Sequence, residues 1–227
     1  MLTPQVIRGV LSALAEPVYR DFQSGLMPTV PKEKVLGVRA PRLHQLAKKI
    51  TAKERDLFLA DLPHRYYDED LLHVYLINGM RSYDRALAEV RRFLPYINNW
   101  ATCDSLRPKV FAKNTEALLP FVEALLGSTA LYPCRLGIGF LLSFYLGDAF
   151  HPDHLSRVAA IKSEEYYLLM MQGWYFATAL ALQYDATLPY YTEGRLTPEI
   201  RAFAVKKALE SNRIDGETKA LLRSLSS

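Results

Sequence analysis

The sequence has few cysteines and no metal-ligand pattern. Cys103 and Cys134 are its two cysteines, too few for a disulfide framework and without the spacing of metal ligands. We therefore expect a cytoplasmic protein, because thiols stay reduced in that compartment. The close histidine pair His151 and His154 stands at an expected helix start with no third ligand nearby, so we predict that no metal is bound.

Long apolar segments and nucleotide-binding motifs are also missing. The longest apolar run, residues 136–146, is about half of the ~20 residues that a membrane-spanning helix needs. Residues 1–17 lack the long apolar core of a signal peptide. Gly137 and Gly139 lie in an apolar helical run with no strand before it, unlike a phosphate-binding loop, and no serine or cysteine stands in a nucleophile motif. We expect no membrane association and no cofactor.

What the sequence does contain is helical periodicity. Val6, Val10, Leu14 and Val18 are four residues apart and predict one helix face over residues 4–22. Similar patterns recur in segments of 10–18 residues, about twelve in all, and no stretch alternates long enough for a strand. The chain is therefore expected to be all-α.

A Leu-Pro pair followed by an aromatic ring recurs at residues 62–64, 94–96, 119–121 and 188–190, and we interpret it as a loop-to-helix junction. The steps are 32, 25 and 69 residues, close to one or two repeats of roughly 35 residues in HEAT or tetratricopeptide proteins. We predict a curved α-solenoid of antiparallel helix pairs (a HEAT-like or armadillo-type α–α superhelix). No linker divides the chain, so a single domain over residues 1–227 is expected.

Positive charge is concentrated near the N-terminus. Residues 1–50 hold eight basic and three acidic side chains, although the whole chain has a net charge of only +4. This distribution suits a polyanion such as nucleic acid, and it is equally compatible with a solvated helix face. The basic side chains are Arg8, Arg20, Lys32, Lys34, Arg39, Arg42, Lys48 and Lys49.

The chemistry is expected at Trp100 and Asp104. A helix that starts at Asn98 and Asn99 brings these residues, at i and i+4, onto one face. An indole beside a carboxylate can stabilise a cation through the ring face and the full charge. The structural alternative is a core tryptophan with an aspartate that caps the next helical turn.

Two further residues favour a functional site. Arg135 opens a very apolar helix, where its guanidinium must reach solvent, a carboxylate or a phosphate. Trp174 follows Gly173 inside an expected helix, and a glycine there indicates close approach by another group.

The chain resembles the bacterial DNA alkylation repair glycosylases with HEAT-like repeats (AlkD-type). The resemblance lies in the order and spacing of three features: Trp100-x-x-x-Asp104, Arg135 at the head of its helix, and Gly173-Trp174. The segments 37–48 and 206–211 are also similar to this family, so nearly the whole chain is covered.

The resemblance implies excision of cationic N3- or N7-alkylated purines from double-stranded DNA by a monomer. Asp104, Trp100 and Trp174 would be catalytic, with the carboxylate and the ring faces stabilising an oxocarbenium-like sugar. Arg135 would hold a phosphate near the lesion. Arg39, Arg42 and Lys48 are expected to contact DNA as part of the basic N-terminal segment.

The chain departs from the family in residues 24–37, where the best-known members have a continuous second helix. Gly25, Pro28, Pro31 and Gly37 make such a helix improbable here. Three hypotheses remain: an alkylpurine DNA glycosylase, a DNA-binding relative without efficient excision, and a protein-binding helical scaffold. The basic N-terminal segment speaks against the scaffold.

Overall fold

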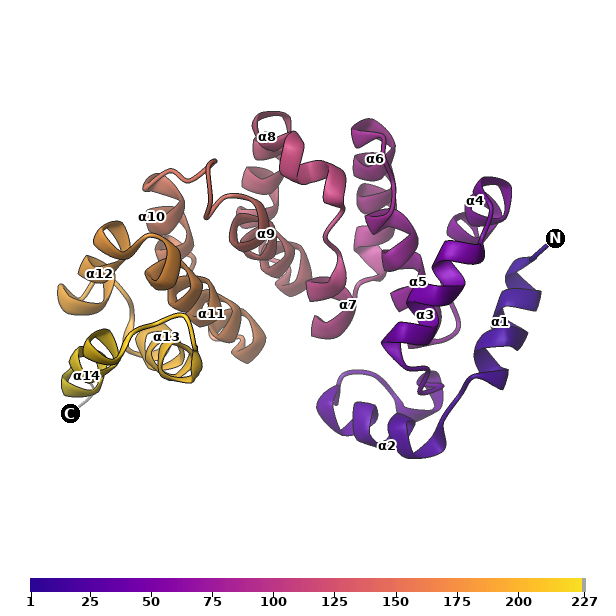
Figure 1. Ribbon diagram of the computed structural model, residues 1–227, viewed down its shortest axis with the longest axis horizontal. Coiled ribbons are helices and arrows are strands. Elements are labelled where there is room, and N and C mark those ends of the chain that lie inside the picture. Colours follow the sequence, from indigo (N-terminus) through magenta and orange to yellow (C-terminus); the bar gives the residue numbers. More distant parts are fainter. Residues whose placement is uncertain (226–227) are drawn as a thin grey trace. The chain divides into compact units, whose positions relative to one another are not determined.

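The computed structural model describes residues 1–225, and these residues contain fourteen α-helices, three short 3-10 helices and no strand (Figure 1). The prediction of an all-α protein is confirmed. The chain divides into two compact units, Met1–Lys113 and Asn114–Ser227, which are described separately below. The single domain expected over residues 1–227 stays a prediction. None of the described helices is long and apolar enough to cross a membrane.

The first unit is built around a central helix, α5. The α-helices of this unit are α1 (Pro4–Ala13), α2 (Pro17–Leu26), α3 (Ala40–Lys49), α4 (Ala52–Ala60), α5 (Tyr67–Asn78), α6 (Tyr83–Phe93) and α7 (Trp100–Ser105). Short 3-10 turns lie at Lys32–Lys34, Leu94–Tyr96 and Lys109–Lys113. Helix α5 contacts α1, α3, α4, α6 and α7, and this explains why most of its apolar side chains and the acidic Asp68 and Glu69 are buried.

The prediction of one helix face over residues 4–22 is wrong. Pro17 begins a second helix, since proline suits the first helical position and cannot continue an existing ladder of hydrogen bonds. Helix α1 buries Ile7 and Leu11 instead, while Val6 is 46% and Val18 84% exposed.

The second unit consists of helices packed closely on one another. They are α8 (Thr115–Leu126), α9 (Leu131–Phe144), α10 (Asp153–Ala160), α11 (Tyr166–Leu182), α12 (Tyr184–Thr192), α13 (Pro198–Glu210) and α14 (Gly216–Ser224). A Cβ added at Gly173 of α11 would lie 2.4 Å from the Cβ of Phe203 and 2.9 Å from the backbone nitrogen of Ala204. The close approach predicted at Gly173 is confirmed, and the neighbour is α13.

The Leu-Pro-aromatic segments are not uniformly junctions. Pro120 lies inside α8 and Pro189 inside α12, so the interpretation is wrong at these two positions. Each helix loses one backbone hydrogen bond at its proline. In α8 the flanking Leu118, Phe121 and Val122 are buried, and this packing holds the helix in place. Residues 94–96 form a 3-10 turn directly after α6, and residues 62–64 lie in the connection between α4 and α5.

Candidate functional site

The expected site lies on α7, a helix of six residues with a defined start. Asn99 is the N-cap, as its place before Trp100 predicts, and its Oδ1 accepts from the backbone N–H of Thr102 at 2.8 Å. Its Nδ2 donates to Thr102 Oγ1 and to Asn98 Oδ1, both at 3.0 Å. Asn99 is only 1% exposed, so the cap is a buried and fully used polar group.

The other end of α7 is fixed by Asn78, the last residue of α5. Its Nδ2 donates to the carbonyl of Ser105, and its Oδ1 accepts from the backbone N–H of Arg107, both at 2.7 Å. A helix this short is marginal by itself, and two asparagines from outside its hydrogen-bond ladder compensate for that. Sequence reasoning missed Asn78, because nothing near it in the chain indicates the contact.

Trp100 and Asp104 lie one turn apart on α7, in agreement with the i, i+4 prediction, and both are half-buried. The indole Nε1 of Trp100 donates to the carbonyl of Leu26 at 3.1 Å. That bond ties the ring to the end of α2 and fixes its orientation. The residues between them on the other side of the helix, Thr102 and Cys103, are buried.

Residues 27–39 are irregular apart from one 3-10 turn, so the expectation that no continuous second helix crosses residues 24–37 is confirmed. The carboxylate of Asp68 on α5 accepts from the backbone N–H groups of Leu36 at 2.6 Å and Val38 at 2.7 Å. Gly37 has φ +85°, and a Cβ there would lie 2.6 Å from the backbone nitrogen of Arg20. A buried carboxylate and a glycine therefore set this turn.

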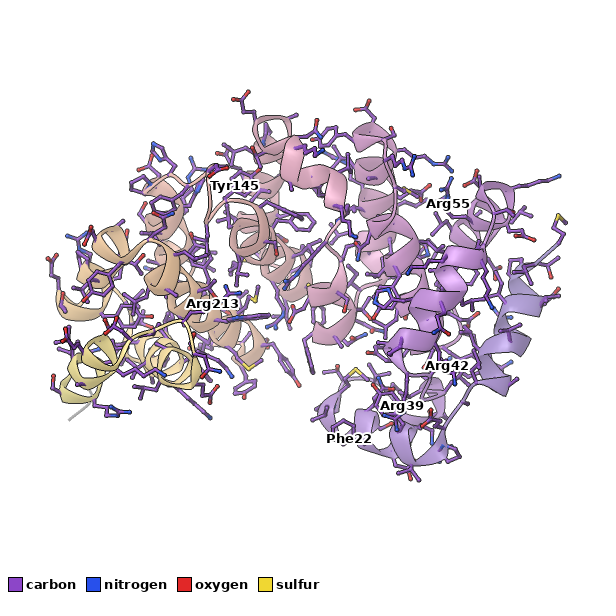
Figure 2. All side chains as sticks on the ribbon, in the orientation of Figure 1. Phe22, Arg39, Arg42, Arg55, Tyr145 and Arg213 are labelled. Carbon is purple, nitrogen blue, oxygen red and sulfur yellow. The ribbon has the colours of Figure 1, made fainter. Side chains whose placement is uncertain are left out.

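The basic residues predicted to contact DNA do not form one cluster. Arg39 and Arg42 lie at the start of α3 (Figure 2), and Arg39 pairs with Glu16 at 2.8 Å and covers the ring of Tyr19. Arg42 and Lys48 are exposed, but they are about a third of a turn apart around the helix. All three lie in the first unit with Trp100 and Asp104.

An apolar stripe on α2 was not anticipated. Val18 is 84%, Phe22 62% and Leu26 49% exposed, and their four-residue spacing places them on one face. The stripe ends at Leu26, the residue whose carbonyl accepts from Trp100. The signal was present in the sequence once α2 is taken to begin at Pro17, since Val18 then belongs to the second helix.

In the second unit, Arg135 lies in α9 and is buried. The residue is 1% exposed, and a guanidinium nitrogen, Nη1, donates to the carbonyl of Tyr167 on α11. The phosphate contact expected for Arg135 stays a prediction. The partners expected for Arg135 were solvent, a carboxylate and a phosphate, and the observed partner is a backbone carbonyl.

Trp174 lies on α11 in the second unit and is half-buried. The structure thus brings Trp100 and Asp104 together on one helix and gives Trp174 and Arg135 a place in the other unit. Within the described residues, no group of three or more histidine, cysteine or acidic side chains could hold a metal ion.

The family model described as DNA alkylation repair enzyme matches residues 7–161. The match covers more than half of the chain and includes both Trp100-x-x-x-Asp104 and Arg135. A comparison with curated proteins finds no match. The resemblance seen in the sequence is confirmed: the chain belongs to the DNA alkylation repair enzyme family, which indicates a role in the repair of alkylated DNA.

Proposed function

We propose that the protein is a DNA glycosylase that excises cationic N3- or N7-alkylated purines from double-stranded DNA. The observation that carries this proposal is the pairing of Trp100 and Asp104 on a helix whose two ends are fixed by Asn99 and Asn78. A preorganised carboxylate stabilises positive charge that develops in a transition state better than a mobile one does.

The chemistry requires little acid catalysis. An alkylated purine carries a positive charge, so when its bond to C1′ of the deoxyribose breaks, the bonding electrons neutralise the leaving base and no proton is needed. Positive charge then develops on the sugar. Asp104 stabilises that charge and orients the water whose oxygen bonds to C1′, and the water's proton passes to the carboxylate or to solvent.

Trp100 supplies a flat face of the proposed site. The indole N–H of Trp100 is held by Leu26, so its ring face is presented to a cationic sugar in a fixed orientation. Trp174 belongs to the second unit, and the catalytic role that the resemblance implies for it stays a prediction. Arg135 is buried and donates to the carbonyl of Tyr167, and its contact with a phosphate near the lesion stays a prediction.

DNA contact is assigned to the first unit. Arg42 and Lys48 are exposed and suit phosphates, and Arg39 lies beside Arg42. The exposed stripe of Val18, Phe22 and Leu26 has the character of an apolar wedge against the minor groove.

The decisive experiment measures release of 7-methylguanine from an alkylated duplex by the wild-type protein and by Asp104→Asn. We expect Asp104→Asn to lower the rate about a hundredfold or more, as removal of a group that stabilises transition-state charge does. Asp84→Asn, at an exposed position in the first turn of α6, is the matched control and should leave the rate unchanged. Undiminished release by Asp104→Asn contradicts the role of this carboxylate.

The interruption at residues 27–39 favours a second candidate, a DNA-binding protein of this family without efficient excision. Duplex binding that weakens steeply with salt, together with no base release by the wild-type protein, supports that alternative. Binding that is insensitive to salt contradicts both candidates, since each depends on phosphate contacts.

A further inference from the structure

Three consecutive carboxylic acids open α5, and they differ in their partners. Asp68 accepts from the backbone of the 36–38 turn, and Glu69 pairs with Arg8 at 2.9 Å. The carboxylate of Asp70 has neither a hydrogen bond nor an ion pair with any residue that the structure describes, and its backbone N–H donates to the carbonyl of Tyr66 at 3.2 Å. Asp68 and Glu69 thus have structural roles, whereas the carboxylate of Asp70 is available to bind a ligand.

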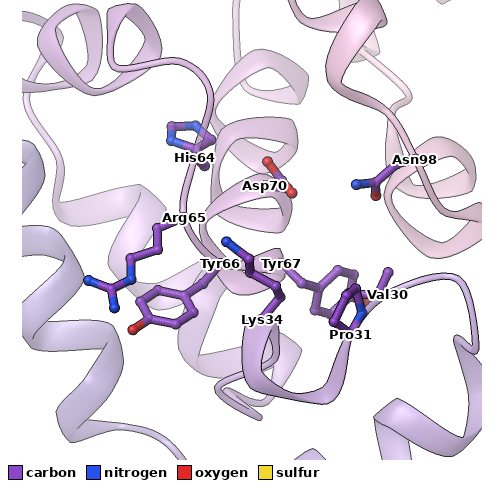
Figure 3. Close-up of a pocket in the computed structure, with 9 residues that line it drawn as sticks. All are labelled: Val30, Pro31, Lys34, His64, Arg65, Tyr66, Tyr67, Asp70 and Asn98. Atoms are coloured by element: carbon purple, nitrogen blue, oxygen red, sulfur yellow. The ribbon is translucent and has the colours of Figure 1, made fainter.

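Asp70 faces a cavity of about 210 Å³ in the first unit (Figure 3). The cavity exceeds by far the ~10–15 Å³ that one water molecule needs. Residues of the irregular segment 27–39 line it, and so does Asn98, which precedes Trp100 by two residues in the chain. Its lining residues are Val30, Pro31, Lys34, His64, Arg65, Tyr66, Tyr67, Asp70 and Asn98.

Asn98 and Lys34 are among the hydrogen-bond donors that line the cavity with Asp70. The side-chain oxygen of Asn98 accepts from Asn99 Nδ2 at 3.0 Å, which leaves the amide N–H groups of Asn98 as donors. Lys34 contributes an ammonium group and, like Asp70, makes no ion pair among the described residues. Figure 3 shows Lys34 and Asn98 extending toward Asp70 from two sides.

This combination of charges excludes simple ions as the natural occupant. Once Asp70 is ionised, a phosphate would meet its carboxylate, and a cation would meet the charges of Lys34 and Arg65. Tyr66 and Tyr67 add aromatic rings to the lining. The cavity therefore suits a flat, neutral molecule that has donors and acceptors side by side.

The guanine base has this pattern on its Watson–Crick edge. Its N1–H and N2–H2 groups are adjacent donors that one carboxylate can accept, and its O6 is an acceptor for Lys34 or Asn98. Adenine presents an N6–H2 donor beside an N1 acceptor and cannot give two hydrogen bonds to the same carboxylate. We propose that this cavity binds the guanine base of an unpaired nucleotide in DNA.

The bound base would stabilise the ionised form of Asp70, which is the form that accepts two N–H groups. Burial, reinforced by the nearby carboxylates of Glu69 and Asp68, raises the pKa of Asp70 to about 8. A charged form that lacks donors is costly, and two N–H groups from a bound base would supply them. The proposal rests on the proposed function for its DNA, but not on base excision.

The test compares three otherwise identical duplexes: one with a single bulged guanine, one with a single bulged adenine, and one fully paired. Fluorescence anisotropy at pH 9, where Asp70 is ionised, measures binding by the wild-type protein, Asp70→Asn and the control Asp84→Asn. We expect the wild-type protein and the control to bind the guanine bulge about tenfold or more tighter than the adenine bulge. Asp70→Asn should abolish this preference and leave binding of the fully paired duplex unchanged.

Equal affinity of the wild-type protein for the two bulges overturns the proposal, and so does a preference that survives in Asp70→Asn. Failure to bind any of the three duplexes is a failure of the proposed function instead. In that case the cavity is tested alone, with free guanosine and adenosine and the NMR signals of Tyr66 and Tyr67 as the readout. Absence of a guanosine-specific perturbation then overturns the proposal.

Discussion

The two units are stabilised by different kinds of contact. In the first unit, buried polar side chains hold irregular backbone in place: Asp68 binds the 36–38 turn, and Asn99 and Asn78 fix the ends of α7. In the second unit, helices approach one another closely at glycines. Gly173 contacts α13, and a Cβ at Gly137 would lie 3.0 Å from the Cβ of Leu125 on α8.

The two kinds of contact have different consequences for the two units. Polar anchors of irregular segments let the first unit present a short helix, an exposed stripe and a cavity, none of which a regular helix pair provides. Direct packing of helix on helix makes the second unit sensitive to added volume. Four substitutions test this comparison.

The largest effect is expected for Gly173→Ala. The new methyl group would lie 2.4 Å from the Cβ of Phe203, so α11 and α13 must move apart, and we expect a loss of about 3 kcal/mol in the free energy of unfolding. The control is Gly9→Ala in α1, where nothing lies within 4 Å. Higher helix propensity should make that variant more stable by about 0.5–1 kcal/mol. Urea unfolding measures both, and equal effects would contradict close packing at Gly173.

Asp68→Ala should destabilise the first unit by about 2 kcal/mol, because two buried backbone N–H groups lose their acceptor. Asp61→Ala removes an exposed partner of Arg8 at 3.4 Å and should cost less than about 0.5 kcal/mol. Urea unfolding gives the free energies, and limited proteolysis at residues 27–39 should be faster in Asp68→Ala alone. Unchanged proteolysis would show that the turn does not depend on this carboxylate.

Asn99→Ala removes the N-cap of α7 and should cost about 1 kcal/mol. Ser82→Ala removes the N-cap of α6, whose side chain accepts from Arg85 at 3.4 Å, and should cost a similar amount or less. Base release, measured well below the melting temperatures of both variants, should fall in Asn99→Ala and not in Ser82→Ala. Equal rates would mean that the order of α7 does not matter for the site.

The smallest effect concerns pH. The pKa of Asp70 is raised from the ordinary value of 3.8 to about 8, so Asp70 keeps its proton to a higher pH in the folded protein than in the unfolded chain. The contribution of protonated Asp70 to the free energy of unfolding is fully present below about pH 4 and is lost as the pH rises through about 8. Asp70→Asn should therefore match the wild type at pH 4 and exceed it by about 1 kcal/mol at pH 9, a modest gain because the side chain is partly exposed. Melting curves at both pH values measure the difference, and a gap that does not change with pH contradicts the raised pKa.

Local sequence was sufficient for several features of the protein. Helical periodicity predicted an all-α chain, and the four-residue spacing of Trp100 and Asp104 after Asn99 predicted their common helix. Pro28 and Pro31 predicted the interruption after α2. Each of these depends on neighbours within one or two turns, where backbone geometry leaves few choices.

Tertiary structure decided what lies far apart in the chain. The sequence could not show that Arg135 is buried against the carbonyl of Tyr167, that Asn78 fixes the end of α7, or that α2 leaves Val18 and Phe22 exposed. It also could not separate Asp70 from Asp68 and Glu69, three acids in a row that differ only in what packs against them. Burial and hydrogen-bond partners are set by non-local packing, and that packing determines which charged side chains are structural and which are left to bind a ligand.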